Sequence, residues 1–155
     1  MTRRAGFTLV ETLLVVVVVG ILTLMTYPRV NAAVTRSDIR GARTRVANML
    51  ATARTVATQS SRTARLRFEG NKVFVTASPR RTVGGAGACA CDTVGLVVDL
   101  NTVYGTTTTL SGGTTEIVYD PRGLASGFGG DVTITLARGG HSQALKIDML
   151  GRVTK

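Results

Sequence analysis

The chain has 155 residues, a formal net charge of +10 and 18 glycines, and it contains no tryptophan and few aromatic residues. This length excludes an assembly of several large domains. Once the N-terminal apolar segment is set aside, about 90 residues remain, enough for one small core. The composition favours a thin, turn-rich β head, and nine of the 19 basic residues fall between Arg29 and Arg67.

The N-terminus places two arginines before Gly6 and Phe7, and the apolar run that follows contains one charge, Glu11. The run from 7 to 27 is long enough to span a bilayer as a helix. A charge in such a segment costs about 2.5–3.5 kcal/mol at mid-bilayer, so the presence of Glu11 there requires an explanation. The alternatives are a secretory signal, which normally has a shorter apolar core and a small-residue cleavage site after it, and a plain signal anchor.

The stretch Gly6-Phe7-Thr8-Leu9-Val10-Glu11 resembles the N-terminus of type IV prepilins and type II secretion pseudopilins. The resemblance implies that a prepilin peptidase, which is also an N-methyltransferase, cuts after Gly6 and that the exposed Phe7 is N-methylated. It implies that Glu11 meets the α-amine of Phe7 in a neighbouring pilin or pseudopilin subunit. It also implies a single pass through inner-membrane lipid, with a cytoplasmic N-terminus and a periplasmic head, before assembly into a periplasmic or extracellular filament.

A helix is predicted to continue beyond the apolar run to about Ser60. Pro28 is expected to kink this helix and not to end it, because the helical pattern resumes. Gly41 is a weak point near the middle. Apolar residues recur on one face at i+3 and i+4 spacing, and most arginines lie off that face. The face comprises Val30, Ala33, Val34, Ile39, Ala42, Val46, Met49, Leu50, Ala53 and Ala57.

This division predicts four segments: a leader over 1–6, a transmembrane helix half over 7–28, an amphipathic stalk half over 29–61 and a β-rich globular head over 62–155. At 1.5 Å per residue the helix is roughly 80 Å long and outruns one bilayer. Its second half can pack on the head. Its first half needs lipid or other copies of itself, which suits a filament subunit.

Beyond Ser61 the apolar residues alternate with polar ones, a pattern typical of strands. The pattern predicts a hairpin over 63–77, strands over 94–100, 106–110 and 116–119, and a turn over 120–123. A closing hairpin is predicted to join 132–136 to 144–149 through a turn over 137–141, and 78–92 is predicted to be a surface loop. The predicted fold class is α+β, with the long helix packed on a small antiparallel sheet.

Two short stretches, 119–124 and 149–153, resemble landmarks of the type II secretion pseudopilin H and FimT-like minor pilins. The predicted function is therefore a minor pilin or pseudopilin, a structural filament subunit of a type II secretion pseudopilus or a type IV pilus. We expect no enzymatic activity, because no motif supplies catalytic chemistry.

The C-terminal tail suggests a second function. It resembles the basic glycine-arginine tail through which FimT-like minor pilins contribute to DNA binding during uptake. The candidate contacts are Arg152 and Lys155, joined by Arg138 and Lys146. Such binding would be mainly to phosphate and would weaken steeply with salt. The alternative is a last strand that ends in ordinary surface charge.

Cys89 and Cys91 lie in a glycine-rich stretch, separated by one residue. A disulfide between them would close a strained ring, and two free thiols are the alternative. Together with Asp92 and His141 they form a weak set of metal ligands, because zinc motifs usually separate cysteines by two to four residues. We expect no metal and no cofactor.

Overall fold

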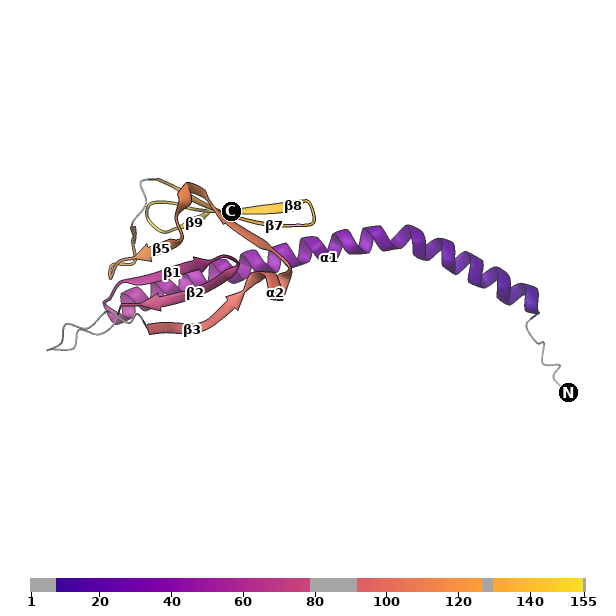
Figure 1. The fold of residues 1–155 in the computed structure, drawn as a ribbon, viewed down its shortest axis with the longest axis horizontal. Helices are drawn as coiled ribbons and strands as arrows, with labels where there is room; N and C mark the ends of the chain where they lie inside the picture. Colours follow the sequence, from indigo (N-terminus) through magenta and orange to yellow (C-terminus); the bar gives the residue numbers. More distant parts are fainter. Residues whose placement is uncertain (1–7, 79–91, 127–129, 155) are drawn as a thin grey trace. The chain divides into compact units, whose positions relative to one another are not determined.

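The structure, a computed structural model, describes residues 8–78, 92–126 and 130–154 (Figure 1). The chain divides into two compact units, Met1–Arg36 and Ser37–Lys155. Helix α1 (Leu9–Ser60) contributes its first part to the N-terminal unit and its second part to the C-terminal unit. The helix predicted to end near Ser60 is therefore confirmed.

In the N-terminal unit the large apolar side chains of α1 are exposed. Its large apolar residues from Leu9 to Val34 are 46–78% exposed. Two threonines of the apolar run, Thr23 and Thr26, donate their hydroxyls to backbone carbonyls four residues earlier, each at 2.8 Å. These bonds satisfy both hydroxyl donors, as an apolar surrounding requires. The helix runs through Pro28 without a break, and the predicted kink stays a prediction.

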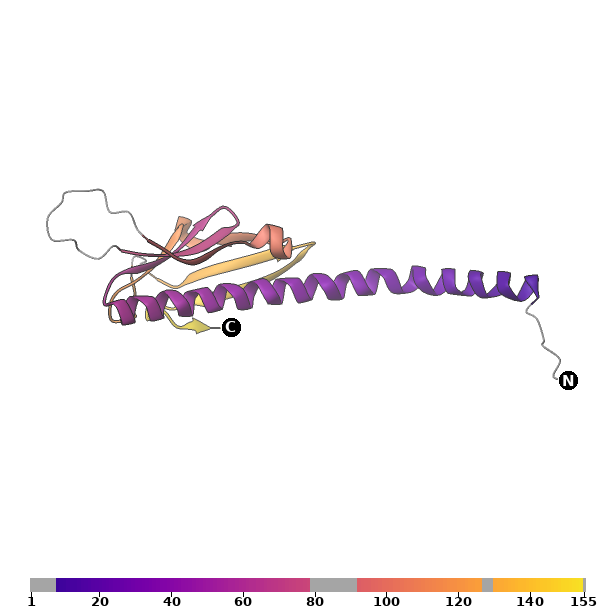
Figure 2. The ribbon, with the colours of Figure 1, turned by 90° about the horizontal axis from the view of Figure 1, so that it is seen from below.

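The C-terminal unit adds two antiparallel sheets to the second part of α1, where one sheet was predicted. Sheet A has the strand order β3-β2-β1-β5-β6 and sheet B the order β4-β7-β8-β9. Figure 2 shows both sheets running along this part of α1. The elements of the described residues are β1 (Ala64–Glu69), β2 (Lys72–Ala77), β3 (Asp92–Asp99), α2 (Leu100–Tyr104), β4 (Thr107–Leu110), the 3-10 turn η1 (Ser111–Gly113), β5 (Glu116–Tyr119), β6 (Ala125–Ser126), β7 (Val132–Arg138), β8 (His141–Ile147) and β9 (Val153–Thr154).

Both predicted hairpins form, and the prediction of their residues is more accurate for the first than for the second. Strands β1 and β2 pair from Ala64↔Ala77 to Glu69↔Lys72, as predicted. The hairpin of β7 and β8 extends further than predicted, because Gly139 and Gly140 both adopt positive φ and turn the chain in two residues. Residues 137–138 and 141–143 therefore belong to the strands, and β8 ends at Ile147.

A short helix, α2, begins where the predicted third strand was expected to end. The carboxylate of Asp99 accepts hydrogen bonds from the backbone N–H groups of Asn101 (2.9 Å) and Thr102 (3.2 Å). These bonds, with that of Thr102 the largest contribution, lower the pKa of Asp99. Leu100 is therefore helical, and the strand prediction for it is wrong, because an aspartate cap overrides the alternating pattern.

One hydrophobic core joins α1 to both sheets within the C-terminal unit. The prediction of the apolar helix face is confirmed from Ile39 onward, since its residues there are buried to 7% exposure or less. They pack with alternate residues of the strands, including Leu66, Ile117, Leu136 and Leu145. The predicted members Val30 and Val34 belong to the N-terminal unit and are about half exposed.

Gly41, predicted as a weak point of the helix, is also a contact point for α2. A Cβ atom at position 41 would lie 2.9 Å from Cε1 of Tyr104. Only glycine lets the tyrosine ring approach the helix this closely. The low helix propensity of Gly41 is thus accompanied by a packing contact.

Candidate functional site

Glu11 lies in the first turn of α1, which Thr8 caps. The N–H of Glu11 donates to the Thr8 hydroxyl at 3.3 Å and to its carbonyl at 3.1 Å. The spacing of threonine and glutamate is that of a capping box, and an acid in the first turn also stabilises the helix dipole. Thr8 was not among the predicted site residues, although this spacing is visible in the sequence.

Several predicted site residues lie outside the part of the chain that the structure describes. They are Gly6 and Phe7 near the N-terminus, Cys89 and Cys91 in the predicted surface loop, and Lys155 at the C-terminus. Asp92 and His141 are described and lie in different sheets, on β3 and β8. Within the described residues, no three histidine, cysteine or acidic side chains gather as a metal site.

Each described candidate for DNA contact has an acidic partner. The guanidinium of Arg138 pairs with Asp38 of α1 and donates to the Tyr104 carbonyl at 2.6 Å. The ammonium of Lys146 lies 2.8 Å from Asp131. This hydrogen bond with Asp131 raises the pKa of Lys146.

Arg152 pairs with Asp148 at 3.0 Å. The ladder places Lys146 opposite Thr154, and Arg152 directly precedes β9, so Lys146 and Arg152 lie at the same end of β8. Arg138 stands at the far end of the hairpin, about 17 Å away along β8. The structure thus brings together two of the candidates, and it uses Arg138 to tie β7 to α1.

The two sequence landmarks form the same kind of turn. The carboxylate of Asp120 accepts the N–H groups of Arg122 (2.9 Å) and Leu124 (2.8 Å). The carboxylate of Asp148 accepts those of Leu150 (3.0 Å) and Arg152 (2.8 Å). In each turn an aspartate is followed three residues later by a glycine with positive φ, which the geometry requires.

Both turns are packed against the body of the unit. A Cβ on Gly123 would lie 2.9 Å from Cγ2 of Thr58 on α1, and one on Gly151 would lie 2.7 Å from Cε1 of Tyr119. Tyr119 is buried, and burial raises its pKa to about 12. The landmarks therefore have a structural explanation, since each contains a glycine, Gly123 or Gly151, at a position where neighbouring residues leave no room for a side chain.

These features define a class of protein. The helix begins with a capped acid, exposes apolar residues over more than the roughly 30 Å of a bilayer's hydrocarbon core, and then becomes the core helix of a small two-sheet unit. By length and composition α1 can cross a membrane, with a mean hydropathy of 2.5 in its most apolar window. This is the architecture of a type IV pilin-like subunit with an N-terminal membrane anchor.

Comparisons with known proteins agree with this class. Residues 1–27 match the prokaryotic N-terminal methylation motif, and residues 42–151 match the type II transport protein GspH. The GspH match covers more than half of the chain, so the chain belongs to the GspH family. It is a minor pilin or pseudopilin, a family of structural subunits.

Solved structures show the same fold at low identity. A crystal structure of the Pseudomonas aeruginosa type IV minor pilin FimU in space group P21 matches with a TM-score of 0.56 and 16% identity, covering 77% of this chain and 88% of FimU. A second, in space group P65, matches with a TM-score of 0.54 and 16% identity, covering 74% and 90%. No curated protein matches the sequence.

Proposed function

We propose that this minor pilin or pseudopilin is cleaved after Gly6 and enters a filament through the N-terminal part of α1. The observation that carries the proposal is the apolar surface from Leu9 to Val34, whose large side chains are 46–78% exposed. Burying one such side chain contributes about 1.5–3 kcal/mol, so this surface strongly favours lipid or neighbouring helices over water.

Glu11 is the proposed assembly contact. A carboxylate that leaves the membrane surface for a helix bundle needs a partner of opposite charge. Cleavage after Gly6 would create such a partner, the α-amine of Phe7, and in a neighbouring subunit it can reach Glu11. The Thr8 cap supports this role, because it holds the helix start in one conformation.

The remaining assignments follow from this proposal. Prepilin peptidase and other pilin or pseudopilin subunits are its partners. Residues 1–6 are a leader, 7–28 the half that crosses the inner membrane, 29–61 the stalk half and 62–155 the head. The arginines before Gly6 favour a cytoplasmic N-terminus, which leaves the head periplasmic before assembly. The proposed role is structural and non-enzymatic.

The test compares Glu11→Ala and Glu11→Gln with the wild type in cells that assemble the filament. We expect membrane insertion and cleavage after Gly6, read by intact mass, to persist in both variants. Incorporation into sheared filaments should fall sharply, because removing one partner of a buried ion pair costs about 3–5 kcal/mol. Glu69→Gln, which makes the same charge change at an exposed residue at the end of β1, is the control. Normal incorporation of both Glu11 variants contradicts the proposal.

DNA binding is the second candidate, and the proximity of Lys146 and Arg152 favours it. Their side chains are 57% and 68% exposed. Arg152 can turn to a phosphate without breaking the turn, because the Asp148 carboxylate also has backbone partners, and Lys146 pairs with Asp131 outside the turn.

A further inference from the structure

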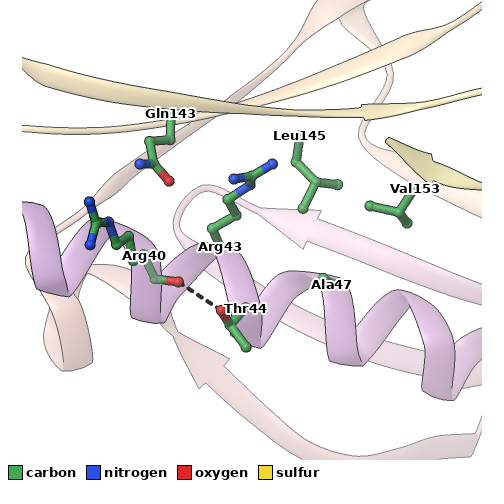
Figure 3. Close-up of a pocket in the computed structure, with 7 residues that line it drawn as sticks. All are labelled: Arg40, Arg43, Thr44, Ala47, Gln143, Leu145 and Val153. Atoms are coloured by element: carbon green, nitrogen blue, oxygen red, sulfur yellow. Dashed lines mark hydrogen bonds between the residues drawn. The ribbon is translucent and has the colours of Figure 1, made fainter. Parts of the chain in front are cut away.

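A groove of about 340 Å³ lies between α1 and the edge of sheet B (Figure 3). Arg40 and Arg43 reach from the helix toward the strand that carries Gln143 and Leu145. The hydroxyl of Thr44 donates a hydrogen bond to the backbone carbonyl of Arg40 at 3.0 Å. The complete lining is Arg40, Arg43, Thr44, Ala47, Gln143, Leu145 and Val153.

The strand beside the groove has an edge that the described strands cover only in part. β8 pairs with β7 along its whole length, but β9 covers only Lys146 and Ile147 of it. The N–H of Asp148 donates across this edge to the Arg152 carbonyl at 3.1 Å. Since N–H and C=O groups of alternate residues share one side of an antiparallel strand, those of Ser142 and Ala144 point to the same edge. No strand of the described residues pairs with them there.

The groove also contains unmatched charge and an unmatched acceptor. Neither Arg40 nor Arg43 belongs to an ion pair of the described residues. The nearby acid of α1, Asp38, is occupied by Arg138. The side-chain oxygen Oε1 of Gln143 is buried and has no donor among the described residues. A buried acceptor without a donor is costly, so a ligand that brings an N–H group is favoured.

We propose that an extended acidic segment of a partner protein binds here, adding a strand to β8 where β9 stops. Its backbone would pair with Ser142 and Ala144, and its carboxylates would face α1 and contact Arg40 and Arg43. The spacing fits: side chains two apart on a strand are about 6.8 Å apart, and helix residues three apart are about 5–6 Å apart. A strand edge offers donors and acceptors in alternation, which matches a peptide and not a phosphate backbone.

This inference goes beyond filament entry through Glu11, because the groove lies wholly in the C-terminal unit. Its test uses the full chain in detergent micelles and needs no filament. The probes are fluorescent peptides of about six residues, the usual strand length. They alternate Thr or Val with Glu, with Gln or with Lys. We expect the Glu peptides to bind about tenfold more tightly than the Gln peptides and the Lys peptides to bind least.

Two matched variants separate the groove from general attraction to a basic protein. Arg40→Gln/Arg43→Gln should bring the affinity for Glu peptides down to that for Gln peptides. Arg54→Gln/Arg122→Gln, which removes the same charge from exposed positions, should leave it within about twofold, since exposed charges act weakly through solvent. If no Glu peptide binds, or if both variants weaken binding equally, the proposal is overturned.

Hydrogen exchange tests the strand addition directly. The amides of Ser142 and Ala144 should exchange quickly in the free protein and gain protection when a Glu peptide binds. Methylating alternate backbone nitrogens of the peptide should abolish both binding and protection. Protection absent at both amides overturns strand addition. Duplex DNA that binds and is weakened by Arg40→Gln/Arg43→Gln would instead assign the groove to nucleic acid.

Discussion

In the turn that begins at Asp148, the backbone conformation and the packing both require glycine at position 151. Gly151 has φ +75, and a Cβ there would lie 2.7 Å from the ring of Tyr119. The residue therefore meets two requirements at once, a left-handed backbone and the absence of a side chain. Gly140 has a similar φ of +79 but open space around it, so it meets only the first requirement.

Gly151→Ala should lower the free energy of unfolding by about 2–4 kcal/mol, because backbone strain adds to the clash with Tyr119. Gly140→Ala should cost less, about 1 kcal/mol, because it introduces the backbone strain alone. Chemical unfolding of the full chain in detergent measures both. Equal destabilisation of the two variants would show that the proximity of Tyr119 is unimportant.

Asp148 makes the same turn sensitive to acid. Hydrogen bonds to its carboxylate hold the pKa of Asp148 below its usual value of 3.8, and the largest contribution comes from the backbone N–H of Arg152. A carboxyl whose pKa is lower in the folded state contributes its full stability above the unfolded value. That contribution disappears as the pH falls through the lower, folded value.

The thermal midpoint of the wild type should therefore fall as the pH decreases below about 4. Asp148→Asn should reduce this dependence, since its side chain does not titrate there. A series of melting curves between about pH 2 and about pH 6 measures it, with Glu69→Gln as the exposed control. Identical pH profiles for the wild type and Asp148→Asn would refute the role of this carboxylate.

At the scale of elements, the ion pair of Asp38 and Arg138 joins α1 to the end of β7 across 100 residues of sequence. The two side chains are only 30% and 35% exposed, and Arg138 also donates to the Tyr104 carbonyl. The pair thus fixes three elements, α1, α2 and β7, at one point. Arg138 thus has a structural role, and its predicted contact with DNA stays a prediction.

A double-mutant cycle with Asp38→Ala and Arg138→Ala should give a coupling energy of about 0.5–1 kcal/mol, after allowance for solvent screening. Arg138→Ala alone should cost more than Asp38→Ala, because it leaves two acceptors without their donor. The more exposed pair of Lys146 and Asp131 is the control and should show a smaller coupling. Equal couplings in both cycles would count against a joining role.

At the scale of the whole molecule, the charge of +10 attracts any polyanion, so DNA binding by itself proves little. A dedicated site is distinguished by which residues change the salt dependence. If each side chain neutralises one phosphate, Arg152→Gln and Lys146→Gln should each reduce the salt slope of duplex DNA binding by about 0.9. Arg138→Gln should have little effect on the slope, because Arg138 is engaged with Asp38. Retardation assays at several salt concentrations decide this, and equal slopes for all variants would exclude a site at the tail.

The sequence alone determined the features that depend on residues close together in the chain. The Gly6-Phe7-Glu11 motif, the apolar face of α1 from Ile39 onward and the hairpin of β1 and β2 all follow from spacing and periodicity within a few residues. Family membership followed from the same local motifs, which is why the matched family agrees with the prediction.

Only the tertiary structure decided which distant segments meet. Strand β1 pairs with β5 some fifty residues later, so the strands divide into two sheets, which no local pattern specifies. The pairing of Arg138 with Asp38 has the same origin. Pairing energies between strands depend on the whole set of available partners. The edge of β8 beside Arg40 and Arg43, which no described strand covers at Ser142 and Ala144, therefore became visible only in the folded chain.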